Sequence, residues 1–169
     1  MFEKVREAFG GIDTLSVDAD GIRASSDLRL ATAVILLEIA QIDGAYSSEE
    51  GRSIFLTLEK EFGLTKENTH ALLEDASINA GGQRRMDHFV EIINSHFDVL
   101  QKQRILADAW RIISADGETS QQESKFAVTL REKLGLSMEQ SLRARKLAEE
   151  GVDLGDAAKL VHFGAKDEG

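Results

Sequence analysis

Asp43-Gly44-Ala45-Tyr46-Ser47-Ser48-Glu49-Glu50 and Asp116-Gly117-Glu118-Thr119-Ser120-Gln121-Gln122-Glu123 are two copies of one pattern, DGxxSxxE. The copies are 73 residues apart, from position 43 to position 116, and a repeat at a fixed offset indicates a duplicated structural unit. In each copy the glycine can end one helix, and the serine with the glutamate three residues later forms the pattern of a capping box. The two motifs therefore predict two similar corners between helices.

The sequences that flank the two motifs also match each other. Ile39-Ala40-Gln41-Ile42 precedes the first motif and Ile112-Ile113-Ser114-Ala115 precedes the second. After each motif, Phe62-Gly63-Leu64-Thr65 corresponds to Leu134-Gly135-Leu136-Ser137 with one residue deleted. Each half of the chain therefore predicts the same order: a helix, the DG loop, a helix, a turn containing Gly and Leu, and a helix.

The duplication predicts how the halves pack. The repeated units cover about residues 27–80 and 104–150. The first helix of each unit, 27–42 and 104–115, is apolar on most of its faces, which is typical of a helix that its neighbours cover. We expect these two helices to pack against each other about a pseudo-twofold axis, as duplicated helical hairpins would.

The composition favours an all-α fold. The chain of 169 residues is 42% hydrophobic and 30% charged, as globular proteins are. It has no proline and only 6% aromatic residues, so it carries few signals for strands. We predict about seven to nine helices from the spacing of apolar residues. They are expected at 2–9, 27–42, 48–62, 66–78, 85–100, 104–115, 121–134, 138–149 and 156–163.

The length of the chain, and the glycines and small polar residues that separate its predicted helices, indicate one main domain. Residues 1–26 are expected to form a short N-terminal helix and an acidic, serine-rich loop. Residues 27–163 are expected to form a single helical domain, and residues 164–169 a tail.

Charge and hydropathy exclude several classes of partner. The formal net charge is −10, which disfavours binding to nucleic acid. The longest apolar run, 30–37, is far shorter than the roughly 20 residues of a membrane span, so no direct membrane insertion is expected. The first nine residues mix acidic and basic side chains and lack the apolar core of a secretory signal. Together with the absence of cysteine, this predicts a cytoplasmic location.

The aspartates of the two motifs need a partner. Asp43 and Asp116 follow helix C-termini, where the helix dipole disfavours a carboxylate. One explanation is an Asx-type turn onto the N–H groups of the next helix. The other is a divalent cation, Ca²⁺, Mg²⁺, Mn²⁺ or Zn²⁺, held by Asp43 with Glu50 and, in the second copy, by Asp116 with Glu123.

Glu38 is a second unusual carboxylate, because it lies within an otherwise apolar helix. A buried charge needs a partner. The offset of 73 residues places Arg111 at the equivalent position of the second unit, so Glu38 and Arg111 are predicted to meet as a buried ion pair. Alternatively, Glu38 reaches the cation at Asp43.

The sequence shows no catalytic constellation. His88 and His96 are eight residues apart and lack the spacing of a zinc-binding HExxH helix, and no GxSxG, phosphate-binding or dinucleotide-binding motif is present. We therefore predict a non-enzymatic binding or adaptor module without a catalytic residue. The alternatives are a metal-dependent hydrolase that uses the loop carboxylates and a structural scaffold without a ligand.

Three stretches resemble the TerB-like family of tellurite-resistance and stress-response proteins. Two of them are Leu37-Glu38-Ile39-Ala40-Gln41-Ile42-Asp43-Gly44 and Trp110-Arg111-Ile112-Ile113-Ser114-Ala115-Asp116-Gly117, each with its following serine and glutamate. The third, Ile92-Ile93-Asn94-Ser95-His96-Phe97, is similar to the connector of an uncharacterised bacterial branch of that family. The resemblance covers roughly residues 27–150.

The resemblance implies a cytoplasmic, all-α domain of helical hairpins with internal pseudo-symmetry and no established catalytic activity. It also implies protein partners in the stress response, some of them membrane-associated, and divalent-metal binding by acidic residues. By position, those acidic residues are Asp43, Glu50, Asp116 and Glu123, with Glu38 as a further member.

Overall fold

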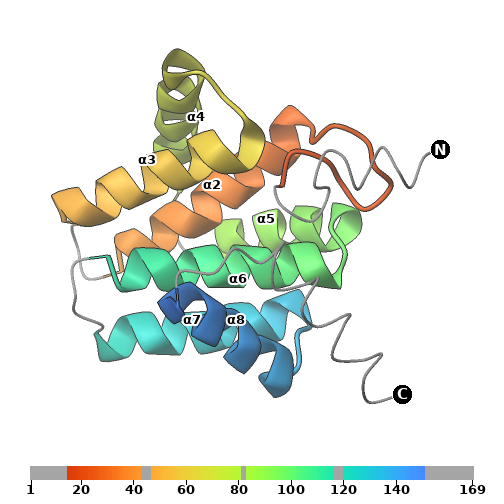
Figure 1. The fold of residues 1–169 in the computed structure, drawn as a ribbon. Helices are drawn as coiled ribbons and strands as arrows, with labels where there is room; N and C mark the ends of the chain where they lie inside the picture. The colour runs from red at the N-terminus through yellow and green to blue at the C-terminus, as the bar shows by residue number, and fades with distance from the viewer. Residues whose placement is uncertain (1–14, 43–46, 81–82, 116–119, 151–169) are drawn as a thin grey trace.

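The computed structural model of the protein describes residues 15–42, 47–80, 83–115 and 120–150. Within these segments the chain forms helices connected by short loops and turns, and the predicted all-α fold is confirmed (Figure 1). None of these helices is long and apolar enough to cross a membrane. The helices are α2 (Ser26–Ala40), α3 (Ser48–Phe62), α4 (Lys66–Asn79), α5 (Gln83–His96), α6 (Val99–Ile113), α7 (Gln121–Leu134) and α8 (Met138–Glu150).

The two predicted corners have the same backbone geometry where the structure describes them. Ser47 precedes α3 with φ −72° and ψ 165°, and Ser120 precedes α7 with φ −77° and ψ 159°. At the other end of each helix, Gly63 and Gly135 are in the left-handed region, with φ 61° and 73°, where a side chain would be strained. The duplicated unit is therefore visible in the conformation of individual residues.

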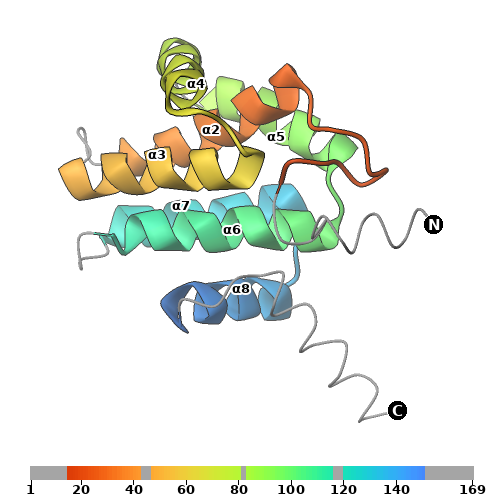
Figure 2. The same ribbon diagram turned by 45° about the horizontal axis from the view of Figure 1, so that its top comes forward.

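Helices α2 and α6 form the centre of the molecule, and they pack against each other as predicted. All residues of 31–37 in α2 and of 103–110 in α6 are buried. Helix α2 also contacts α3, α4 and α5, whereas α6 contacts α3, α7 and α8. Figure 2 shows α6 between α3 on one side and α8 on the other, so α6 is covered from opposite directions.

Residues 15–25 precede α2, and we call them the N-terminal strap. They contain no helix; Val17 and Arg23 form an antiparallel bridge, and Gly21 turns the chain with φ 80°. The strap adds Leu15, which is fully buried, to the main core. The loop that the sequence predicts before α2 is thus an ordered element packed against the helices.

The predicted boundary between the fifth and sixth helices is wrong. Helix α5 ends at His96 and α6 begins at Val99, whereas the apolar spacing predicts helices over 85–100 and 104–115. Asp98 causes the difference, because it forms a capping box with Gln101 in which each backbone N–H donates to the other side chain at 2.9 Å. The helices predicted at 2–9 and 156–163 lie outside the described residues.

Candidate functional site

Each acidic corner of the described structure is built around a capping box. The Ser47 amide donates to Glu50 Oε1 at 2.9 Å, and the Glu50 amide donates back to Ser47 Oγ at 3.1 Å. In the second unit both bonds between Ser120 and Glu123 are 3.0 Å long. The sequence pattern alone predicts these bonds, because they join residues only three positions apart.

The two capping glutamates also meet each other. Glu50 is 6% exposed and Glu123 is 5% exposed. Burial raises the pKa of Glu123 above its ordinary value, and Glu50 raises it further through a carboxyl hydrogen bond and through its negative charge; the two bonds from Ser120 act in the opposite direction. The fold therefore brings one carboxyl group from each half of the chain to a single buried point.

The other candidate metal ligands are placed differently. Asp43 and Asp116 lie outside the described residues, so the structure does not place their carboxylates. Glu38 is described and is partly buried near the end of α2. Among the residues that the structure describes, no group of three or more histidine or acidic side chains has the arrangement of a metal site.

The Glu50–Glu123 pair has a defined chemical capacity. Two carboxyl groups in contact cannot both ionise without repulsion, so the pair either retains a proton or takes up a cation between its oxygens. Oxygen ligands of this kind suit Ca²⁺, Mg²⁺ and Mn²⁺. In both capping boxes the hydrogen bond from serine uses Oε1, which makes Oε2 of each glutamate the natural ligand atom.

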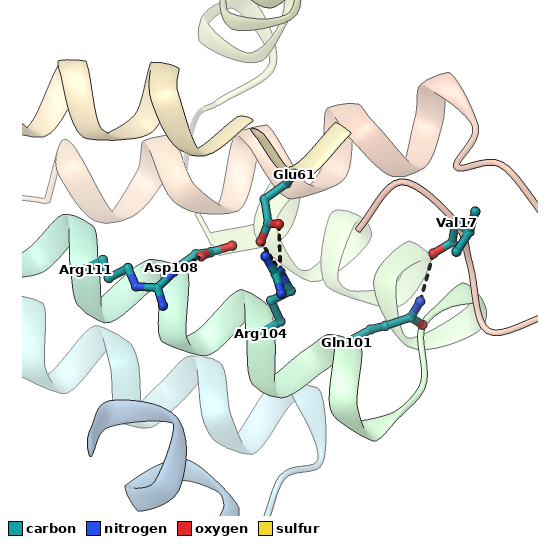
Figure 3. Close-up of polar contacts among 6 residues, drawn as sticks. All are labelled: Val17, Glu61, Gln101, Arg104, Asp108 and Arg111. Carbon is teal, nitrogen blue, oxygen red and sulfur yellow. Dashed lines mark hydrogen bonds and ion pairs between the residues drawn. The ribbon is translucent and has the colours of Figure 1, made fainter. Parts of the chain in front are cut away.

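A second cluster of charged residues lies between α3 and α6 (Figure 3). Arg104 Nε lies 2.7 Å from both Oε1 and Oε2 of Glu61. Each of the two side chains is only 2% exposed. The pair joins the last turn of α3 to the first half of α6, and removal of either partner would leave an uncompensated buried charge.

Asp108 extends this buried charge cluster along α6. Asp108 is 1% exposed, and Arg111, which is partly exposed, donates to its Oδ1 at 3.2 Å. Burial, followed by the charge of Glu61 and a hydrogen bond with it, raises the pKa of Asp108 well above its ordinary value, against the opposing effect of Arg104 and Arg111. A hydrogen bond between the carboxyl groups of Asp108 and Glu61 requires a proton on one of them, and Oδ2 of Asp108 is buried and accepts no other hydrogen bond.

Sequence reasoning missed this cluster although a signal for it was present. Asp108 lies in the run Ile105-Leu106-Ala107-Asp108-Ala109-Trp110, which is as apolar as the helix around Glu38. The same search for ionisable residues in apolar helices would have singled out Asp108. It would not have found Glu61, because α3 is amphipathic and its acidic residues look exposed in the sequence.

Arg111, predicted to be buried against Glu38, is only partly buried in the described structure. The Arg111 side chain is 27% exposed and bonds Asp108 on its own helix. Glu61 and Arg104 form a fully buried ion pair that connects the two halves of the chain. Arg104 points toward Glu61 of α3, whereas Arg111 lies near the C-terminal end of α6 and bonds a residue of its own helix.

Comparison with known protein families gives a match over most of the chain. The family model described as tellurite resistance protein TerB matches residues 29–146, which include both capping boxes and the buried charge cluster. No curated protein matches the chain, and no solved structure does so.

Proposed function

The chain belongs to the TerB family, and from that premise we propose that it is a non-enzymatic, cytoplasmic binding module whose affinity for a protein partner depends on a divalent cation. The cation would bind between the two acidic corners. Glu50 and Glu123 would contribute one oxygen each, and the aspartates of the two motifs, Asp43 and Asp116, are the further ligands that we assign to it. Glu38, near the end of α2, is the fifth candidate.

The observation that carries this proposal is the contact between Glu50 and Glu123. Each residue belongs to a different half of the chain, and each is the third residue of its helix. Burial and, to a smaller extent, the contact with Glu50 raise the pKa of Glu123, and a bound cation would offset both effects by stabilising the ionised carboxyl group. A cation at this point would therefore tie the N-termini of α3 and α7 together.

This arrangement offers a physical route from cation to partner. Without a cation, the two carboxyl groups repel each other when both are ionised. With one, the repulsion becomes an attraction to a shared charge, and the relative position of the two corners is fixed. A partner that contacts both corners would then bind a preorganised surface, which lowers the ordering cost of association. The partners that we propose are proteins of the stress response, including membrane-associated ones.

Thermal unfolding with added Ca²⁺, Mg²⁺, Mn²⁺ or Zn²⁺ tests the proposal. A native-state site stabilises the fold by about 2.7 kcal/mol when the free cation is a hundredfold above Kd, so at least one cation should raise Tm in a saturable way. The Glu50→Gln/Glu123→Gln variant should lose this increment, because glutamine keeps the capping box and removes both charges. A pull-down of cytoplasmic partners with and without chelator then tests the cation dependence of binding.

Two further variants separate a site from general charge effects. Asp43→Asn/Asp116→Asn should also lose the increment, although asparagine still supports an Asx-type turn. Glu139→Gln, which removes an exposed charge in the first turn of α8, should keep it. If all four proteins respond equally to every cation, binding is not at the corners and the proposal fails.

A ligand-free scaffold is the second candidate, and one observation favours it. Both glutamates already accept a hydrogen bond from the serine of their own box, and a capping box needs no metal to explain its glutamate. Under this alternative no cation shifts Tm, and the Asp43→Asn/Asp116→Asn variant stays within about 1 kcal/mol of the parent protein.

A further inference from the structure

The outward side of α4 is acidic and carries an exposed isoleucine. Ile78 is 77% exposed, more than any other large apolar side chain of the described residues. It shares one side of the helix with four further exposed residues at helical spacing. We call the set the α4 face, and its members are Glu67, Ala71, Glu74, Asp75 and Ile78. This face therefore combines three carboxylates with one large apolar group.

The outward side of α8 carries apolar groups and the opposite charge. Met138 and Leu142 are one turn apart and are 56% and 59% exposed. The exposed cations next to them complete what we call the α8 face, which consists of Met138, Leu142, Arg143, Arg145 and Lys146. Arg145 also pairs with Glu149 at 3.2 Å. In a chain with a net charge of −10, the middle of α8 is thus a local concentration of positive charge.

The internal repeat shows that the fold requires neither face. Helices α4 and α8 are the third helices of the two units, and after the one-residue deletion the offset between the units is 72, as from Gly63 to Gly135. Glu74 of the α4 face then corresponds to Lys146 of the α8 face, and Leu142 corresponds to His70. Equivalent positions thus carry opposite charges in one half and in the other, so packing of the third helix does not explain them.

The two faces cannot meet within one molecule. Helix α4 packs on α2 and α3, whereas α8 packs on α6. Figures 1 and 2 both show α4 and α8 on opposite sides of the molecule, with α3 and α6 between them. A contact between the α4 face and the α8 face therefore needs two copies of the chain.

The spacing of charged and apolar groups is the same on the two faces, in opposite chain directions. On α4 the acidic residues 74–75 precede Ile78 by three and four positions. On α8 the basic residues 145–146 follow Leu142 by three and four positions. If the helices run antiparallel with Ile78 against Leu142, the acidic and the basic residues also lie opposite each other, because each pair is about 4.5–6 Å along its helix from the apolar contact. Charge and apolar surface are then complementary together.

We propose that the α4 face of one molecule binds the α8 face of a second copy of this chain in this antiparallel arrangement. The contact joins two different faces, so each bound molecule keeps one further face of either kind, and copies can associate head to tail. Two single helices are expected to bury less than the roughly 1,200 Å² of a stable interface, so the association is weak and depends on concentration. The inference goes beyond the proposed function and does not involve the cation.

Sedimentation velocity of the full-length protein in chelator tests this inference. At about 0.15 M salt the repulsion between acidic chains is screened beyond about 8 Å, whereas charge pairs in contact still attract. The weight-average mass should rise with protein concentration past that of a dimer, and it should fall as salt is increased. A mass that stays at the 18.6 kDa of the monomer up to about 1 mM protein would overturn the inference. The chelator makes the outcome independent of the proposed cation site.

Charge reversal tests the two faces separately. Glu74→Lys/Asp75→Lys makes the α4 face basic, and Arg143→Glu/Lys146→Glu makes the α8 face acidic without altering Arg145. Each variant should associate at least about tenfold more weakly than the parent protein, because like charges then face each other. The variant with all four substitutions has the net charge of the parent protein and opposite charges across the contact, so it should associate again.

Matched controls separate the contact from general effects of charge and hydropathy. Glu91→Lys/Glu132→Lys changes the net charge as much as the α4 reversal does, at exposed positions of α5 and α7, and should not weaken association. Ile78→Asn should weaken it at least about tenfold, whereas Ile22→Asn, at a residue that is 63% exposed in the strap, should leave it unchanged.

Two results with these variants contradict the inference, provided that circular dichroism shows each variant to be folded. If reversal of only one face weakens association, that face binds a different segment or a different surface. If the variant with four substitutions does not regain association, the two faces do not bind each other.

Discussion

Arg104 Nε lies 2.7 Å from both carboxylate oxygens of Glu61, in a region where each side chain is only 2% exposed. The internal repeat does not reproduce this pair. The offset of 73 residues places Ala31 opposite Arg104, and after the one-residue deletion, where the offset is 72, Lys133 corresponds to Glu61. The two halves therefore share their caps and differ in the charges that they bury.

Replacement of Arg104 by methionine should destabilise the protein by about 3–5 kcal/mol, because it leaves the Glu61 carboxylate buried without its partner. Urea unfolding followed by circular dichroism measures the loss. The double variant Glu61→Leu/Arg104→Met should recover most of it, since an apolar pair of similar volume carries no desolvation cost. Equal stability of the single and double variants would show that Glu61 does not depend on Arg104.

Asp108 should make the stability depend on pH. Because its pKa is raised in the folded state, the native protein retains a proton that the unfolded chain releases near pH 4. The stability that this proton provides is fully present below the unfolded pKa and is lost as pH rises through the folded pKa. The asparagine of the Asp108→Asn variant does not titrate, so this variant does not lose stability in this way. Its free energy of unfolding should therefore exceed that of the parent protein by an amount that grows as pH rises above about 4.

Urea unfolding of both proteins at a series of pH values measures this difference. The measurement must compare the two proteins at each pH, because Glu123 also has a raised pKa and contributes a slope of the same sign. That slope is present in both proteins and cancels in the comparison. A difference that is constant across the series would mean that Asp108 does not titrate as its burial and its contact with Glu61 require.

Glu50 and Glu123 should show energetic coupling. In cation-free buffer at neutral pH, Glu50→Gln or Glu123→Gln alone should stabilise the protein, because either one removes the repulsion between the two carboxyl groups and retains its capping box. The double variant should gain less than the sum of the single variants, since the repulsion can be removed only once. A double-mutant cycle from urea unfolding measures the coupling. If the changes in unfolding free energy of the two single variants add up exactly to that of the double variant, the two carboxyl groups do not interact.

Arg145 of α8 should stabilise the contact with α6 through Trp110. Its guanidinium carbon lies 4.4 Å from the centroid of the indole ring, so Arg145→Ala should cost about 0.5–1 kcal/mol. Trp110 is the single tryptophan of the chain, and its emission spectrum should change in the same variant. Glu149→Gln is the matched control, because it removes the exposed ion pair with Arg145 and keeps the stacking; it should leave the emission unchanged.

Much of the helical framework could be predicted from the sequence. The starts of α3 and α7 follow from serine and glutamate three residues apart, and their ends follow from Gly63 and Gly135. The largest boundary error, at the junction of α5 and α6, arose from a capping box of Asp98 and Gln101, a less familiar form of the same signal. A helix cap is formed by atoms of residues only a few positions apart, so the local sequence is sufficient to predict it.

The candidate site was predictable only in part. The sequence identified Glu50 and Glu123 as members of two corners, but their contact depends on how α3 and α7 are placed by the rest of the fold. The Glu61–Arg104 pair joins residues 43 positions apart, and no local pattern marks such a pair. The hydrogen bonds of the strap with α3, α5 and α6 were missed for the same reason.

The sequence by itself determined that this protein is an all-α TerB domain with two equivalent capped corners, because helix periodicity and caps arise from interactions within one or two turns. Only the tertiary structure decided which charges are buried together and where the N-terminal strap lies. Those outcomes depend on desolvation, which is set by all the helices that pack around a side chain. The pKa of Asp108, for example, is raised chiefly because the surrounding helices bury its carboxyl group.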